Sequence, residues 1–290
     1  MSFKKYFTAA CATLVFSAAA QAGFVYQART TIEGDGIGGT QTTTIDAWVE
    51  GESARIELHE GDGMGFLEED SYMLTHDAGE TMIFVNTKEQ TWSRFDMGAT
   101  MNVAAAAMEG LGSLMKMEFT DFHMEKLGDE DGGEILGYDT RHMRFRSGYT
   151  MKMSVMGREM NQVVDMDQEI WATDAIDASA FSAWMRPDKR LKGMFEGLDK
   201  VLEQQYSQVQ GAPLRAIIKT TMKDHRGKES TTLNTTDVLT LNEENVDDSM
   251  FEIPAGYEEA AFMNDGEAGA ESEEDDPLSE LRDLFKRKKN

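Results

Sequence analysis

The sequence predicts an α+β fold that consists mostly of antiparallel β-strands. Short segments with apolar residues at every second position recur about every ten residues, and glycine-rich turns separate them. Two other segments carry apolar residues at three- and four-residue steps, which is the period of a helix. The 290 residues of the chain are enough to bury a sizeable core.

The start of the chain has the pattern of a secretory signal peptide, at residues 1–22. Lys4 and Lys5 form a short positive segment, and an uncharged run from Tyr6 to Ala20 follows. Ala22 completes a small-x-small pattern that predicts cleavage directly after it. The uncharged run of about 15 residues is shorter than the roughly 20 that a transmembrane helix needs. We therefore expect an exported, periplasmic protein without a transmembrane segment.

Cleavage changes the composition of the chain. It removes Cys11, the only cysteine, so the mature protein is expected to have no disulfide and no thiol chemistry. A lipid-modified Cys11 is not expected, because Thr8 stands where a lipoprotein signal has an aliphatic residue. The lost segment holds two of the 28 basic residues and no acidic ones, which changes the net charge from −25 to −27. Such a charge repels phosphate backbones, which argues against nucleic-acid binding.

Residues 23–263 are predicted to form one β-rich domain. Between Gly23 and about Phe95 the period-two pattern predicts a meander, with strands at Thr40–Val49, Ser53–Leu58, Tyr72–Leu74, Thr81–Val85 and Thr91–Phe95. Further strands are expected at Phe119–Leu127, Tyr138–Phe145, Tyr149–Val155, Gln162–Trp171, Leu214–Lys223 and Ser230–Leu241. The acidic segment Gly128–Glu134 is predicted to be the turn between the first two strands of this second group.

Two segments are predicted to be helical. The first, Ala99–Met117, is almost uncharged, and Gly110 and Gly112 weaken it. Its apolar stripe consists of Met97, Met101, Ala104, Met108, Leu111 and Met115. The second begins near Pro187 and ends at Gly211. Its amphipathic face consists of Leu191, Met194, Phe195, Leu198, Val201, Leu202 and Val209.

The last segment, residues 264–290, differs in composition from the domain. Gly266–Asp276 is acidic and rich in small residues, which is typical of a disordered linker. Pro277–Lys289 is predicted to form a short helix with Leu278, Leu281, Leu284 and Phe285 on one face and a basic end. In one interpretation this helix binds an envelope protein partner or an anionic membrane surface. In the other it is too short to be stable alone.

No motif in the sequence predicts catalysis. Gly34–Gly39 fits the G-x-G-x-x-G pattern, but the β-branched run that follows is a poor helix start, so we interpret it as a hairpin loop. Asp129–Asp131 lacks the spacing of an EF-hand loop, and Asp165–Glu169 lies on a predicted strand. The five histidines have no local ligand spacing, and no serine lies in a nucleophile elbow. We therefore expect neither an enzyme nor a cofactor.

Methionine is unusually frequent in the middle of the chain. Twelve of the 21 methionines lie between Met97 and Met166. Thioethers select Cu(I), and Met151, Met153 and Met156, with Met160 nearby, have a spacing that a copper site can use. Two other interpretations remain open: an adaptable apolar site for varied hydrophobic partners, and plain core packing.

Several short patterns in residues 23–257 resemble a known superfamily. These patterns are Ala54–Glu57, Thr87–Trp92, Ile135–His142, Gln168–Thr173, Gly211–Arg215 and Phe251–Tyr257. With the signal peptide and the meander, they resemble the periplasmic lipoprotein-carrier superfamily, the LolA/LolB-like proteins, and an uncharacterised exported family related to them.

The resemblance implies an unclosed barrel: a strongly curved antiparallel sheet with helices packed on its concave face. A gap between helices and sheet is then expected to receive an acyl chain. Its expected lining is Met101, Met108, Leu111, Met115, Trp184, Met194, Phe195 and Leu198. The function expected on this basis is non-enzymatic binding of a lipid, lipoprotein or other hydrophobic ligand in the periplasm. The alternative is an envelope scaffold that acts through its acidic tail and C-terminal helix.

Overall fold

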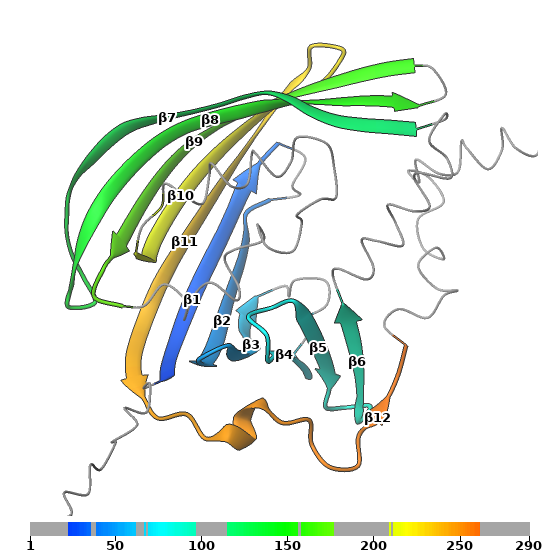
Figure 1. Ribbon diagram of the computed structural model, residues 1–290, viewed down its shortest axis with the longest axis vertical. Helices are drawn as coiled ribbons and strands as arrows, with labels where there is room; N and C mark the ends of the chain where they lie inside the picture. Colours follow the sequence, from blue (N-terminus) through cyan, green and yellow to red (C-terminus); the bar gives the residue numbers. More distant parts are fainter. Residues whose placement is uncertain are drawn as a thin grey trace, which may run out of the picture.

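The computed structural model describes residues 23–35, 39–61, 67, 69–96, 115–155, 158–176, 209 and 211–261. Within these residues twelve strands form a single sheet (Figure 1). The strands are β1 Gly23–Gly34, β2 Gln41–Glu50, β3 Ser53–Gly61, β4 Ser71–Thr75, β5 Thr81–Asn86, β6 Thr91–Asp96, β7 Met115–Ile135, β8 Tyr138–Val155, β9 Arg158–Thr173, β10 Ala212–Lys223, β11 Glu229–Glu244 and β12 Glu258–Glu259.

The sheet is open and consists of two meanders joined in the middle. Its strand order is β12-β6-β5-β4-β3-β2-β1-β11-β10-β9-β8-β7. The long strands pair antiparallel, and the two-residue β12 pairs parallel with β6. The order ends at β12 and β7 rather than closing on itself, and Figure 1 shows that the sheet is strongly curved. The prediction of a mostly β, unclosed antiparallel sheet is confirmed.

One face of the sheet, which we call the core face, carries the main core. Residues that pair on neighbouring strands point to the same face of the sheet. The strand register therefore shows which residues of each strand belong to the core face. One such row runs through five strands from Met73 through Ile56, Ala47 and Tyr26 to Leu241. The first four of these residues are buried, and the fifth packs against the same cluster. Alternation of apolar and polar residues in the sequence therefore builds this core.

The segment after β11 covers part of the opposite face. It runs from β11 to β12 along the edge of the molecule (Figure 1) and contains the 3-10 helix η1, Asp248–Phe251. The carboxylate of Asp247 caps η1 by accepting a hydrogen bond from the Ser249 amide at 2.9 Å. Farther along, Ile253 and Tyr257 pack against the outer side chains of β4 and β5. This segment thus attaches the C-terminal meander to the N-terminal one.

The predicted turn at Gly128–Glu134 is wrong, because this segment is part of β7. Its carboxylates lie opposite basic residues of β8: Asp129 pairs with Arg141, and Glu130 lies 3.3 Å from Arg144. A Cβ at Gly132 would lie 2.9 Å from the indole of Trp171, so this glycine makes room for a side chain from β9. Ion pairs between strands and close packing over glycine therefore keep an acidic, glycine-rich segment extended.

The predicted helices lie largely outside the described residues, at 97–114 and 177–208. The described residues contain η1 and no α-helix, so they do not support the expectation of helices on the concave face. The end of the first predicted helix is wrong, since Met115 and Met117 belong to β7. No helix within the described part of the chain is long and apolar enough to cross a membrane.

The actual turn between β7 and β8 is a strained two-residue hairpin. Leu136 has a φ of 54° and Gly137 a φ of 84°, which places both in the left-handed region that type I′ turns require. Leu136 is 41% exposed, so its side chain gains little packing in return. Leu136→Asn is expected to raise the free energy of unfolding by about 1 kcal/mol, measured by urea denaturation. Leu136→Ala is the control, because it removes the leucine but keeps the unfavourable φ and should bring no such gain.

Candidate functional site

The core face of β8, β9, β10, β11 and β1 is uncharged over most of its length. Four successive rows across these strands contain only apolar, hydroxyl and amide side chains. From β8 outward, the rows are Met143-Ile170-Ala216-Thr236-Thr30, Phe145-Gln168-Ile218-Asn234-Ile32, Ser147-Met166-Thr220-Thr232-Gly34 and Tyr149-Val164-Met222-Ser230. Charged residues of the same segment occur at the ends of the strands, at Arg141 and Arg158. The geometry is that of a broad, neutral surface.

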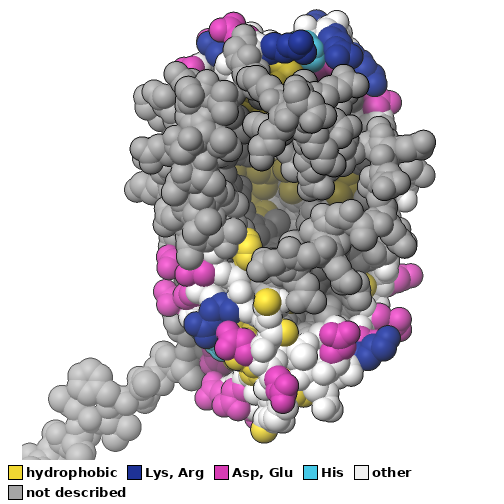
Figure 2. All heavy atoms as spheres, turned by 90° about the vertical axis from the view of Figure 1, so that its right-hand side faces the viewer, with side chains coloured by type: hydrophobic (Ala, Val, Ile, Leu, Met, Phe, Trp, Pro, Cys, Tyr) yellow, Lys and Arg dark blue, Asp and Glu magenta, His cyan; other side chains and the backbone are white. Residues whose placement is uncertain are grey.

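Burial changes along this surface. Met143, Phe145 and Ile170 are buried in a cluster of their own, against which Ala216 and Met124 pack. Farther along the strands, Ile218 and Met222 are only half-buried. Figure 2 looks onto the open side of the sheet and shows hydrophobic side chains within a hollow of this face. The surface therefore has a packed end and an incompletely covered end.

A polar pair lies within the packed part. The amide nitrogen Nε2 of Gln168 donates a hydrogen bond to Oγ of Ser147 at 2.9 Å, and both residues are buried. A buried amide without a partner is costly, so this bond allows two polar residues to sit between apolar rows. The pair fixes the side chains of β8 and β9 relative to each other.

Two tyrosines of the core face have pKa values that burial changes. Tyr149 lies opposite Val164 in the fourth row, and its burial raises the pKa of its phenol above the ordinary value. Burial likewise raises the pKa of Tyr26. Both phenols are therefore neutral at physiological pH, so neither adds a charge to the core face.

The outer face of the same strands is charged and solvated. Arg146 and Asp167 form an ion pair at 2.9 Å, and Arg215 pairs with Asp237. The ring of His142 stacks on Trp171, with 4.0 Å between centroids. Exposed ion pairs such as these two contribute little to the free energy of unfolding, about 0–1 kcal/mol each. Their consequence is that the two faces of one sheet differ sharply in polarity.

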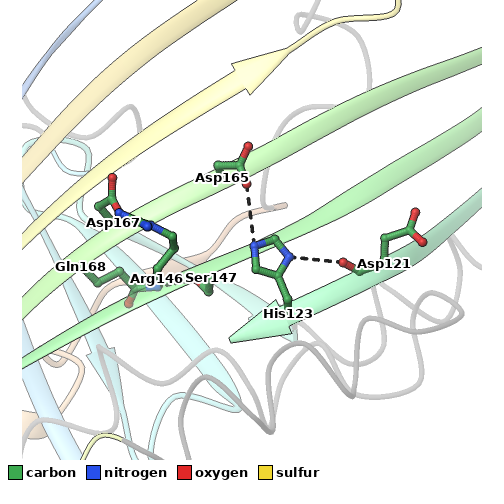
Figure 3. Close-up of polar contacts among 7 residues, drawn as sticks. All are labelled: Asp121, His123, Arg146, Ser147, Asp165, Asp167 and Gln168. Atoms are coloured by element: carbon green, nitrogen blue, oxygen red, sulfur yellow. Dashed lines mark hydrogen bonds and ion pairs between the residues drawn. The ribbon is translucent and has the colours of Figure 1, made fainter. Parts of the chain in front are cut away.

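Figure 3 shows an outer-face arrangement that superficially suggests catalysis. His123 lies with Nε2 3.8 Å from the carboxylate of Asp165 and Nδ1 3.4 Å from the carbonyl oxygen of Asp121. Ser147 pairs with Met124, the residue next to His123, but its row places it on the core face, where Gln168 donates to it. The histidine and the serine therefore lie on opposite faces of the sheet and do not form a nucleophile–base pair.

Metal binding by the usual charged ligands has no support in the described residues. No group of three or more His, Cys, Asp or Glu side chains among them is placed to hold an ion. The acidic clusters of the sequence are divided among ion pairs between strands, as for Asp129 and Asp167. These carboxylates are therefore occupied by basic partners.

Residues 37–257 match a family described as a domain of unknown function, DUF4412. The chain belongs to this family. The match confirms the sequence-based expectation of an uncharacterised family. No curated protein matches the DUF4412 chain.

The solved structures that are similar to this DUF4412 protein include the following two. One is a domain of a proposed outer membrane lipoprotein-sorting protein from Vibrio parahaemolyticus, with 8% identity, a TM-score of 0.30, and coverage of 81% of this chain and 91% of that one. The other is a DUF1329 family protein from Desulfovibrio piger, with 11% identity, a TM-score of 0.30 and the same two coverages. Neither likeness identifies a ligand for this chain.

Of the residues predicted to line a gap, one is described. Met115 lies in β7, paired with Val155, rather than in a helix. The other seven lie outside the described residues: Met101, Met108, Leu111, Trp184, Met194, Phe195 and Leu198. The predicted tail residues Leu278, Leu281, Leu284 and Phe285 lie outside them as well.

Sequence reasoning missed the strand residues of the neutral surface. Met166, Ile218, Thr220 and Met222 lie on it, and none was predicted to contact a ligand. A signal was present, because β10 alternates Lys219 and Lys223 on one face with uncharged residues on the other. What sequence did not show is that five strands align these uncharged positions side by side.

Proposed function

We propose that this protein is an exported, non-enzymatic binding protein for a lipid, lipoprotein or other hydrophobic ligand. The supporting observation is the neutral, half-buried part of the core face around Ile218 and Met222. The signal-peptide pattern of residues 1–22 supports a periplasmic location, where a carrier shields acyl chains from water. The gap that the predicted helices form with the sheet is part of the same proposal.

The energetics favour an acyl chain over a compact polar ligand. Each methylene removed from water contributes about 0.8 kcal/mol, so a long chain binds usefully through area alone. Covering hydroxyl and amide groups such as those of Thr220 and Asn234 with a ligand costs little free energy, since they can keep hydrogen bonds to strand neighbours or water. Methionines such as Met166 and Met222 adapt to chains of different shape.

The test is native mass spectrometry of residues 23–290 purified from periplasm without detergent. We expect additional mass that is released as a phospholipid or an acylated species. Ile218→Lys places a charge on the neutral surface and is expected to reduce bound ligand several-fold, since burying an unpaired ammonium is costly.

Ile217→Lys is the matched control. It is the same change at the adjacent residue of β10, but Ile217 pairs with Glu169 and Thr235 on the outer face. Ligand content should therefore stay as in the parent protein. A clean mass for the parent, with no uptake from phospholipid vesicles, contradicts the proposal. Equal ligand content in the two lysine variants, both shown to be folded by circular dichroism, contradicts the proposed location.

A further inference from the structure

Three methionines lie in one row at the open ends of β7, β8 and β9. Met117 pairs directly with Met153, and Met153 pairs directly with Met160. Directly opposite residues of antiparallel strands have Cβ atoms about 4.5–5.5 Å apart. Three thioether side chains therefore start from adjacent positions on the same face. We call Met117, Met153 and Met160 the methionine row.

The methionine row belongs to the core face and is accessible. Met153 lies on the same face of β8 as Phe145 and Met151, because these residues are separated by even numbers of positions in a regular pairing with β9. Met117, Met153 and Met160 are each half-buried. Arg158 follows one row farther out and is exposed, so solvent and salt screen its charge. An ion can reach the row without passing through the packed core.

A second thioether group adjoins the row. Met151 lies two residues from Met153 on the same face and pairs with Gln162. The amide nitrogen of Gln162 lies 3.5 Å from Sδ of Met222, in a contact that fits a hydrogen bond to the sulfur. The sulfur of Met222 thus has a polar partner on the core face at this end of the sheet. Plain hydrophobic packing does not require such a contact.

The chemistry of this site selects one class of ligand. Thioethers are neutral and soft, so they bind Cu(I) and similar monovalent ions and neglect hard cations that need oxygen ligands. The side chain of methionine has three rotatable bonds, which allows three neighbouring sulfurs to turn toward one ion. The geometry points to a binding site for a soft monovalent cation, Cu(I) or Ag(I), formed by Met117, Met153 and Met160.

One of these three ligands, Met117, is invisible to local sequence spacing. Met151, Met153 and Met156 are close in sequence, but Met156 lies outside the described residues, and Met151 is in a different row from Met153. The antiparallel register instead brings Met117 and Met160 to Met153 from two other strands. The site therefore shares Met153 and Met160 with the candidate that local spacing gives, and the fold adds Met117 from β7.

The test titrates residues 23–290 with Cu(I) in competition with bicinchoninate, and with Ag(I) by native mass spectrometry. We expect one ion per chain. Met153→Leu keeps the apolar volume and removes the sulfur, and it is expected to weaken Cu(I) binding by about tenfold or more. Met117→Leu and Met160→Leu should each have a similar effect.

Met166→Leu is the matched control, because Met166 is a half-buried methionine on the same strand and face as Met160. Its pairing with Ser147 and Thr220 places it three rows away, so Cu(I) affinity should not change. The proposal is overturned if neither ion binds the parent protein. It is also overturned if Met153→Leu binds Cu(I) as tightly as the parent, or if Met166→Leu loses as much affinity.

Lipid content distinguishes this site from the proposed function. Leucine is as apolar as methionine, so Met153→Leu should retain any hydrophobic ligand seen in the parent protein. Loss of Cu(I) binding with lipid unchanged supports a separate metal site. Lipid binding in a parent that takes up no ion leaves the proposed function standing and removes the metal site alone.

Discussion

Phe145→Ala is expected to lower the free energy of unfolding by about 3–5 kcal/mol, the largest effect of any single change considered for this protein. Phe145 is 1% exposed and lies in the cluster with Met143, Ile170 and Ala172. Phe145 also pairs across the strands with Gln168, whose side chain donates a hydrogen bond to the buried Ser147. Truncation leaves a cavity lined partly by a polar pair, which cannot collapse without breaking its hydrogen bond.

Urea denaturation followed by tryptophan fluorescence measures this loss. Phe119→Ala is the control, because Phe119 is the same residue type on the same sheet but is only half-buried, opposite Met151. Its truncation should cost clearly less than that of Phe145. Equal losses for the two variants contradict the conclusion that β8 and β9 have a packed end and an incompletely covered end.

Gly148→Ala is expected to cost about 1–3 kcal/mol, although it adds only one methyl group. Gly148 is buried in β8, and a side chain added there would point to the outer face, toward the ring of His123. A Cβ there would lie 2.5 Å from Cε1 of His123 and 2.7 Å from the carbonyl oxygen of Val164. The imidazole can move away, but the carbonyl is part of the β8–β9 ladder, so the strands must separate locally.

A double-mutant cycle with His123→Ala separates the two contacts. The double variant should recover part of the loss, because the clash with the imidazole is gone, while the clash with the Val164 carbonyl remains. Thermal unfolding by calorimetry gives all four stabilities. A Gly148→Ala protein as stable as the parent shows that β8 and β9 are not in the close register described.

The strands were largely predictable because their period-two pattern is local. The predicted Ser53–Leu58, Thr81–Val85 and Leu214–Lys223 correspond to β3, β5 and β10 with shifts of a few residues at the ends. In β3 the alternation reflects burial of one face, because Ala54 and Ile56 are buried and Glu57 is not. A pattern that arises from burial of one face is visible in the sequence without knowledge of the partner strand.

Features that depend on distant partners were not predictable. Composition made Gly128–Glu134 look like a turn, but cross-strand partners such as Arg141 and Arg144 keep it in β7. The same is true of the candidate sites. Neither the neutral rows around Ile218 nor the meeting of Met117 with Met153 is a property of one segment, because both arise from register between strands.

The position of β1 in the middle of the sheet shapes how this protein folds. One edge of β1 pairs with β2, the next strand in the sequence. Its other edge pairs with β11, with Gly23 opposite Glu244. Contacts between such distant parts of the chain form slowly, because a long loop must close first. Until β11 is available, the N-terminal meander exposes an unpaired, β-branched edge that can pair with other chains. A folding molecule is therefore most prone to aggregate in the interval before β11 pairs with β1.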